Sequence, residues 1–276
     1  LSSSSAASDV YKRQESMIAR EGLGTYIPPG GAIGLQMHYT PFGREVTDTT
    51  QIGLYFYDEQ PPRMLRNSVI MDFSIEIPPG QANHAETAYL EFPKDAELFY
   101  AFPHAHYRGQ SSTLAIQYPD GSEEMILSLP KYDFNWQRAY EFKDPIKVPA
   151  GAKLIARYTY DNSAQNPANP DPTKKIVWGD QSFEEMLYTA ISYRWVDETS
   201  ADQKTQYEEL LRAGRLFGML DDNIDESIQK EEVRGRAGRR LAGSFDKLDQ
   251  NDDGALSWQE YAASFKAKPT ASTGSE

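Results

Sequence analysis

Leu98-Phe-Tyr-Ala-Phe-Pro-His-Ala-His-Tyr-Arg-Gly109 is the stretch from which the fold prediction starts. Its aromatic residues and their alternation predict a β-strand that ends at a glycine-containing turn. Side chains two residues apart on a strand point to the same face, so His104 and His106 are expected to lie side by side. Such a pair is half of a metal site, although two histidines at a strand end also occur for purely structural reasons.

Eight apolar runs of strand length, this one included, are separated by turns rich in proline and glycine. The chain has 276 residues with 19 Gly and 17 Pro, which favours a mainly β architecture of about two domains. We predict an antiparallel β-sandwich of the jelly-roll type. Its strands are expected at Ser68–Ile77, Glu86–Phe92, Glu97–Pro103, Ser112–Tyr118, Glu124–Leu129, Gln137–Phe142, Lys153–Tyr160 and Met186–Trp195.

The composition excludes several kinds of partner and site. A net charge of −13 at pH 7 disfavours nucleic acid and anionic membranes as partners. The chain has no cysteine, so disulfides and thiolate metal sites are excluded. No run of about twenty apolar residues is present, so we expect no membrane span.

Two motifs downstream accompany the histidine pair. They are Tyr132-Asp-Phe-Asn-Trp-Gln137 and Ile176-Val-Trp-Gly-Asp-Gln-Ser-Phe-Glu-Glu-Met-Leu-Tyr188. With Pro103-His-Ala-His-Tyr-Arg-Gly109 they resemble, in order, the second copper domain of the copper type II, ascorbate-dependent monooxygenases, the family of the peptidylglycine hydroxylating and dopamine β-monooxygenases. The resemblance implies a jelly roll in which His104, His106 and Met186 are the ligands of the oxygen-activating copper.

The chemistry of this ligand set agrees with copper. Imidazole suits copper and a thioether is a soft ligand that selects Cu(I), whereas zinc sites use histidine, cysteine and carboxylates. By the resemblance, the protein is an oxidoreductase that hydroxylates a C–H bond with O2 and a reductant such as ascorbate. The alternative is a non-catalytic copper-binding jelly-roll module with a calcium-binding structural domain.

Residues 16–65 resemble the end of the family's first copper domain. Strands are predicted at Ala32–Tyr39 and Gln51–Tyr57, and Leu35-Gln-Met-His-Tyr39 matches a motif of that domain. The resemblance makes His38 a candidate ligand of a second, electron-donating copper. The adjacent His-His pair that completes this site in the family is not in this sequence, so we expect the chain by itself to be inactive.

The substrate positions differ from those of the peptidylglycine enzymes. Those enzymes hold a peptide carboxylate with an arginine two residues before the first histidine and a tyrosine four residues after the methionine. Here these positions are Phe102 and Ala190, so we expect a small neutral or apolar substrate. His84, the remaining histidine, follows a Pro-Pro-Gly turn and is expected to be a surface or hydrogen-bonding residue.

Five segments make up the predicted domain organisation. Residues 1–15 lack the features of a signal peptide and are a disordered leader or an artefact, with a flexible linker as the alternative. Residues 16–65 and 66–197 correspond to the end of the first copper domain and to the second, residues 198–266 to a pair of EF-hands, and residues 267–276 to a disordered tail. We expect a bacterial protein, periplasmic or secreted, whose true N-terminus lies upstream.

The segment Asp249-Gln-Asn-Asp-Asp-Gly-Ala-Leu-Ser-Trp-Gln-Glu260 matches the EF-hand calcium loop at each ligand position. An amphipathic helix is predicted upstream at Asp202–Leu220. Phe245 before the loop and Tyr261 and Phe265 after it give the flanking helices their apolar face. An acidic surface loop is the alternative. The predicted calcium ligands are Asp249, Asn251, Asp253, the Ala255 carbonyl, Ser257 through a water, and the bidentate Glu260.

A second candidate loop, Asp221–Glu232, precedes it. Its sixth residue is Glu226 instead of glycine, and positive φ costs a non-glycine residue about 1–2 kcal/mol. We expect this loop to bind calcium more weakly or only to support its partner, with Ile228 and Leu256 forming a short β contact between the loops. Its ligands would be Asp221, Asn223, Asp225, the Ser227 carbonyl, Gln229 and Glu232.

Overall fold

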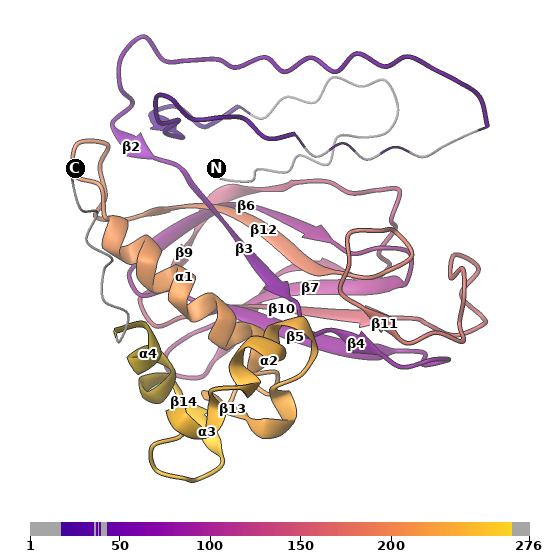
Figure 1. Cartoon of the computed structure of the whole chain (residues 1–276). Coiled ribbons are helices and arrows are strands. Elements are labelled where there is room, and N and C mark those ends of the chain that lie inside the picture. The colour runs from indigo at the N-terminus through magenta and orange to yellow at the C-terminus, as the bar shows by residue number, and fades with distance from the viewer. Residues whose placement is uncertain (1–17, 36, 38, 40–42, 267–276) are drawn as a thin grey trace, which may run out of the picture.

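The computed structural model of the protein describes residues 18–35, 37, 39 and 43–266. In this part the protein is mainly β, with antiparallel sheets followed by a helical C-terminal part, as predicted (Figure 1). The long strands are β3 (Arg66–Asp72), β5 (His84–Glu91), β6 (Ala96–His104), β7 (Gly109–Gln117), β8 (Glu123–Leu129), β9 (Tyr140–Val148), β10 (Lys153–Tyr160) and β12 (Leu187–Trp195).

These strands form two four-stranded antiparallel sheets, one in the order β5-β10-β7-β8 and the other in the order β3-β12-β6-β9. The sheets lie one above the other in Figure 1 and share one hydrophobic core. Leu90 and Leu154 enter this core from the first sheet, and Leu98 and Ile191 enter it from the second. Every second side chain of a strand faces the same way, so each strand contributes a row of apolar residues.

The predicted long strands are confirmed, with most ends within three residues of the prediction, and the two largest differences, at the ends of β3 and β9, have physical reasons. β3 ends at Asp72 because its carboxylate accepts hydrogen bonds from the backbone N–H and the hydroxyl of Ser74, which turns the chain. β9 continues to Val148, beyond the predicted end at Phe142. Its Pro145 is tolerated because β9 is an edge strand, where a missing N–H breaks no ladder.

Two predicted strands in the first segment are not formed. The described residues of 32–39 and 51–57 belong to no strand. A strand needs a hydrogen-bonded neighbour, and side chains here face solvent, with Tyr55 at 91% exposure. The short strands that do form are β1 (Leu23–Gly24) with β2 (Arg63–Met64), in parallel, and β4 (Glu76–Ile77) with β11 (Ile176–Val177), antiparallel.

The helical part begins with α1 (Thr205–Leu220), which confirms the predicted helix. Among the described residues no helix is both long and apolar enough to cross a membrane. The other elements of this part are β13 (Ser227–Gln229), the 3-10 helix η1 (Lys230–Glu232), α2 (Gly235–Ala242), α3 (Phe245–Leu248), β14 (Ala255–Ser257) and α4 (Trp258–Lys266).

The helical part packs directly on the sheet that contains β5 and β10. Phe217 of α1 shares a buried cluster with Tyr89 of β5 and Ile155 of β10, whose side chains leave the sheet on the side opposite to Leu90 and Leu154. A Cβ atom on Gly218 would lie 2.4 Å from the Tyr89 carbonyl oxygen. Only glycine permits this approach, so α1 is closely fitted to the sheet.

Candidate metal centres

β6 ends at the histidine pair and places both rings side by side, as predicted. The ring centroids of His104 and His106 are 5.1 Å apart, with the planes nearly perpendicular. Ala105 between them is fully buried and points away into the core. The alternation of the strand therefore continues past its last residue, His104, and places His106 beside it.

β12 brings Met186 to the same place. Tyr188 of β12 is paired with His104 of β6, and their ring centroids are 6.0 Å apart. Met186 lies directly before β12, and His106 lies two residues after the end of β6. The hydroxyl of Tyr160 donates a hydrogen bond to the Met186 carbonyl over 2.9 Å. The segments that carry the three predicted copper ligands are adjacent, because the Glu185 carboxylate accepts the N–H of His106 over 2.7 Å.

Both imidazole rings are oriented through Nδ1. The Nδ1 atom of His104 lies 2.5 Å from Oε1 of Gln137, and Nε2 of Gln137 donates to the Phe134 carbonyl over 2.7 Å. The Nδ1 atom of His106 lies 3.3 Å from the Glu184 carbonyl oxygen. Since both partners are acceptors, each ring carries its proton on Nδ1 and its lone pair on Nε2, the atom that would bind a metal.

Tyr132 of the second motif fixes the backbone between the histidines. Its hydroxyl accepts a hydrogen bond from the Ala105 N–H and donates one to the Ala105 carbonyl, each over 2.9 Å. Its ring lies against Gly109, where an added Cβ would come within 2.9 Å of the ring and 2.8 Å of the Ala105 side chain. The glycine that ends the histidine motif is therefore required by the approach of this tyrosine.

Glu185 connects the histidine segment to the methionine segment, a role that was not predicted from the sequence. Its side chain is fully buried. One carboxylate oxygen accepts the N–H groups of His106 (2.7 Å) and Met186 (3.1 Å), and the other accepts that of Arg108 (2.6 Å). Burial raises the pKa of Glu185 to about 7, against the opposing effect of these hydrogen bonds. A glutamate directly beside the candidate ligand Met186 was the hint to this role in the sequence, because a carboxylate that becomes buried there needs several hydrogen-bond donors.

Arg108 extends this connection to two neighbouring loops. It is 1% exposed, and its guanidinium donates to the Asn162 side chain and to the Phe183 carbonyl, each over 2.8 Å. Asn162 in turn donates to the carbonyls of Pro78 and Lys174. Both polar side chains are buried. Arg108 thus holds the segment that carries Glu185 and Met186 through hydrogen bonds to the Phe183 carbonyl and to the Glu185 carboxylate.

The candidate second copper ligand, His38, lies outside the described residues. His84 begins β5 and makes a 2.8 Å contact from Nε2 to the Glu86 carboxylate, which confirms it as a hydrogen-bonding residue.

The two acidic loops share one hydrogen-bond pattern. In each, the carboxylate of residue one accepts the N–H groups of residues five and six, and the carboxylate of residue twelve accepts those of residues two and nine. These contacts span 2.9–3.2 Å in Asp249–Glu260 and 2.8–3.0 Å in Asp221–Glu232. The predicted contact between the loops is confirmed, because Ile228 of β13 is paired with Leu256 of β14.

The sixth residues of the loops have positive φ, as predicted. The angle is +86° at Gly254 and +69° at Glu226. Lys153 Nζ of β10 lies 2.7 Å from the Glu226 carboxylate, and the Tyr89 hydroxyl donates to Asp221 over 2.7 Å. Burial raises the pKa of Asp221, so charging this loop is disfavoured relative to an exposed one.

A third acidic group lies between the sheets and the first loop. One oxygen each of Asp72, Glu86 and Asp222 lies within 4.8 Å of the others. Arg234 donates to both Glu86 (2.9 Å) and Asp222. Burial raises the pKa of Asp222 to about 7. Since a guanidinium already bridges these carboxylates, we interpret the group as an ion-pair network that joins the helical part to the sheets.

No protein-family model matches the chain, and no curated protein sequence matches it. Three solved structures show weak similarity. The Yersinia pseudotuberculosis-derived mitogen is 9% identical over 51% of this chain and 93% of its own, with a TM-score of 0.21. The structure of the infectious bursal disease virus Gt strain is 10% identical over 49% of this chain and 37% of its own, with a TM-score of 0.24. The infectious bursal disease virus VP2 subviral particle is 8% identical over 56% of this chain and 49% of its own, with a TM-score of 0.23. At these TM-scores the similarities carry no argument about this chain.

Proposed function

We propose that the protein is a copper-dependent monooxygenase that hydroxylates a C–H bond with O2 and an external reductant such as ascorbate. The observation that supports the proposal is that the segments carrying His104, His106 and Met186 are adjacent where β6 ends and β12 begins. Copper would supply one-electron redox chemistry and O2 activation at this point. Gln137 and the Glu184 carbonyl orient the two rings for it.

The donor set fits copper better than zinc. Two imidazoles and a thioether suit Cu(I). The neighbouring carboxylate of Glu185 uses both of its oxygens for backbone N–H groups, so it is not available as a hard ligand. Zinc sites are built from histidine, cysteine and carboxylate ligands, and this chain has no cysteine.

The proposed jelly-roll topology is supported by the order of strand pairing. The first long strand pairs with the last (β3 with β12), and the second pairs with the next to last (β5 with β10). The third and fourth strands follow the same rule, β6 with β9 and β7 with β8. Such nested pairing arises when one long antiparallel hairpin folds into two sheets, which is the arrangement of a jelly roll.

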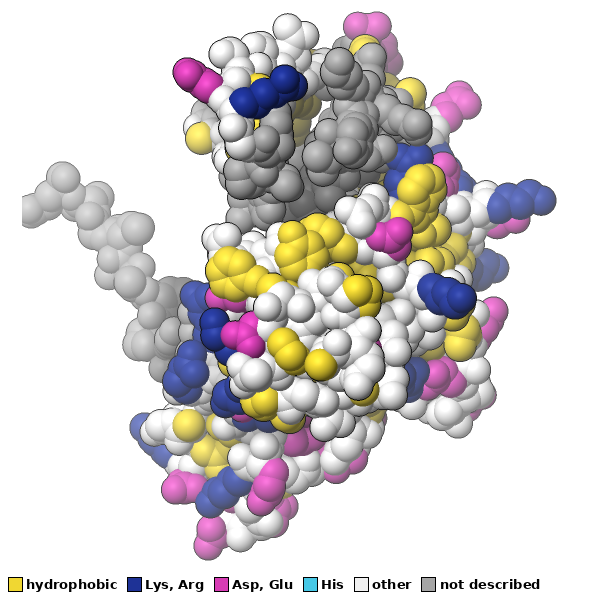
Figure 2. All heavy atoms as spheres, turned by 90° about the vertical axis from the view of Figure 1, so that its right-hand side faces the viewer, with side chains coloured by type: hydrophobic (Ala, Val, Ile, Leu, Met, Phe, Trp, Pro, Cys, Tyr) yellow, Lys and Arg dark blue, Asp and Glu magenta, His cyan; other side chains and the backbone are white. Residues whose placement is uncertain are grey.

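The proposed substrate is small and neutral or apolar. Phe102 and Ala190 are directly paired across β6 and β12, two residues from His104 and Tyr188 on the same face. Neither residue can hold a carboxylate. Figure 2 shows hydrophobic side chains gathered in the middle of the face that it views, which is the right-hand side of Figure 1. The Phe102–Ala190 pair favours an apolar group beside the histidines.

We propose further that Asp249–Glu260 and Asp221–Glu232 are paired EF-hand calcium loops. Their common hydrogen-bond pattern and the Ile228–Leu256 contact support this. The first loop is proposed as the weaker site because Glu226 is strained and because burial raises the pKa of Asp221. Hydrogen bonds from Ser257 lower the pKa of Glu260 in the second loop, so its ligand is charged more readily.

The alternative function is a copper-binding module without catalysis. It is favoured by the histidine inventory, because besides the pair on β6 the chain has only His38 and His84, and His84 contacts Glu86. The chain alone therefore lacks the donor set of a second copper site. EPR of the copper-loaded protein after addition of ascorbate tests for the redox activity that a monooxygenase requires, and a site that keeps its Cu(II) signal would favour the non-catalytic module.

X-ray absorption of the Cu(I)-loaded protein tests the proposed ligands. We expect nitrogen scatterers together with one sulfur scatterer, and we expect Met186→Ala to remove the sulfur. Met125→Ala is the matched control, because Met125 is 62% exposed on β8 in the other sheet. An unchanged spectrum for Met186→Ala would rule out methionine ligation and with it the family assignment.

A further inference from the structure

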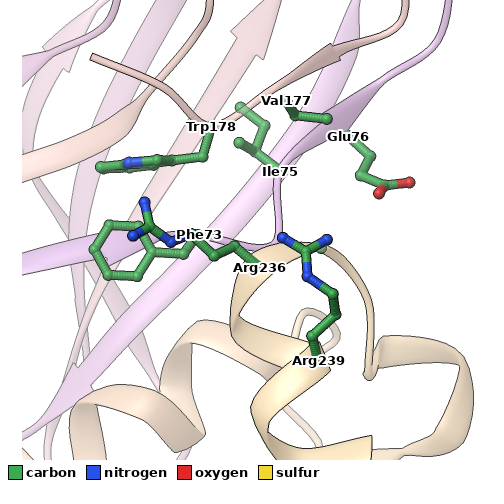
Figure 3. A pocket seen from close by; sticks show the side chains of 8 residues that line it. Phe73, Ile75, Glu76, Val177, Trp178, Arg236 and Arg239 are labelled. Atoms are coloured by element: carbon green, nitrogen blue, oxygen red, sulfur yellow. The ribbon is translucent and has the colours of Figure 1, made fainter.

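We propose that the cavity between β4, β11 and α2 binds a small oxyanion, namely a carboxylate or phosphate group that is free or carried by a small molecule. The cavity has a volume of about 90 Å³. At a share of about 30 Å³ per water in the liquid, this is room for a few waters or one such group. Its lining combines two arginines with an aromatic wall (Figure 3).

Two unpaired arginines supply the positive charge. Arg236 and Arg239 are three residues apart on α2, so their side chains leave the helix on one side. Neither side chain makes a hydrogen bond or ion pair with any residue that the structure describes. Elsewhere Arg66 and Arg157 are paired with carboxylates. In a chain of net charge −13, two adjacent unpaired guanidiniums at one cavity indicate a negatively charged partner.

The acidic residue in the lining does not neutralise these arginines. Glu76 of β4 forms an ion pair with Lys175 at 3.1 Å, and Lys175 is not one of the residues that line the cavity. The cavity also lies at the start of α2, where the helix dipole adds partial positive charge. The charged residues that line the cavity, two arginines and one glutamate, therefore carry a net positive charge. Guanidinium groups match the geometry of carboxylate and phosphate oxygens, which defines the class of ligand.

The opposite wall is apolar and aromatic. The rings of Phe73 and Trp178 meet edge to face with centroids 4.4 Å apart, and Ile75 and Val177 complete the wall. Figure 3 shows both guanidinium groups reaching from α2 toward these strand residues. A ligand that places its oxyanion between the arginines would set the rest of the molecule against Trp178.

The cavity is formed before any ligand binds. Gly235 has a φ of +60°, and a Cβ there would lie 2.5 Å from the Cα of Ser74. The N–H of Arg236 donates to the Phe73 carbonyl over 3.1 Å. These contacts fix α2 against the turn after β3, so little ordering is needed on binding.

Calorimetric titration of the full chain with inorganic phosphate and, separately, with benzoate tests the site. We expect saturable binding of one equivalent of at least one probe, weakened by added NaCl. Tighter binding of benzoate would identify a carboxylate on an aromatic body, and tighter binding of phosphate would identify a phosphate group. Binding should also change the tryptophan fluorescence of the protein, and this change should disappear in Trp178→Phe.

Arginine variants decide whether binding occurs in this cavity. Arg236→Gln and Arg239→Gln should each weaken binding about tenfold or more, as expected for the loss of a charge-assisted hydrogen bond. Arg212→Gln is the matched control, because Arg212 is an exposed arginine of α1 outside the cavity. Absence of saturable binding for both probes, or binding that survives the double substitution of Arg236 and Arg239, would overturn the proposal. Neither result bears on the copper site.

Discussion

The substitution Tyr132→Phe removes a single oxygen atom from beneath the histidine pair. That oxygen satisfies both the N–H and the carbonyl of Ala105, each at 2.9 Å. Ala105 is fully buried, and it sets the position of His104 and His106 on either side. In the variant the ring still fills its place against Gly109, but two buried backbone groups lose their partner.

The size of the effect follows from these two groups. A buried polar group without its partner costs about 1–3 kcal/mol. We therefore expect the unfolding free energy to fall by about 2–6 kcal/mol. For a chain of this size that corresponds to a decrease in Tm of roughly 4–24 °C. Cu(I) affinity should fall about tenfold or more, because groups that position metal ligands act at this level.

Urea denaturation and competition with a Cu(I) chelator measure the two effects. Tyr140→Phe is the control, because its hydroxyl makes no hydrogen bond with a described residue of the protein. If Tyr132→Phe matched this control in both stability and copper affinity, the argument that Tyr132 holds the histidine pair would be refuted.

Three further predictions concern pH and calcium. Burial raises the pKa of Glu185 to about 7, so the native state keeps a proton that the unfolded chain releases above about pH 4. The unfolding free energy should therefore fall as the pH rises from about 4 to 7. In a series of denaturation curves across this pH range, Glu185→Gln should flatten the decrease. The fluorescence of Trp258, whose ring centroid lies 5.5 Å from that of Phe217, should change when calcium is added. Glu260→Gln should remove most of this change and Glu232→Gln little of it, and the reverse ranking would contradict the proposed order of the loops. Glu226→Gly removes the strain of a positive φ and should strengthen calcium binding at the first loop. Calorimetry should then show a second equivalent of bound calcium. An unchanged stoichiometry and affinity would show that strain at Glu226 is not what weakens this loop.

The first segment shows where local pattern misleads. Residues 32–39 and 51–57 have the composition of strands, yet their described residues form none. Strand propensity reflects the fit to neighbouring strands, so it has no effect where no neighbour is present. By contrast, β10 has the bounds predicted for it, because it lies between β5 and β7 and is paired on both edges.

Features that depend on local periodicity and spacing could be predicted from the amino-acid sequence. Alternation along one strand placed His104 and His106 on one face, and the matching positions of the two acidic loops placed Ile228 opposite Leu256. The antiparallel β class followed from short runs between turns. These features involve residues close in sequence or related by a repeated pattern, so they require no knowledge of how distant segments meet.

The tertiary structure alone decided which distant groups support the site. Glu185 reaches the N–H groups of His106 and Arg108, some eighty residues away, and Tyr132 reaches Ala105. Tyr89 on the sheet donates to Asp221 in the first loop. Each contact depends on a buried polar group finding its partner after the sheets and helices have packed. Periodicity cannot specify that partner, because the desolvation of polar groups is set by the whole fold.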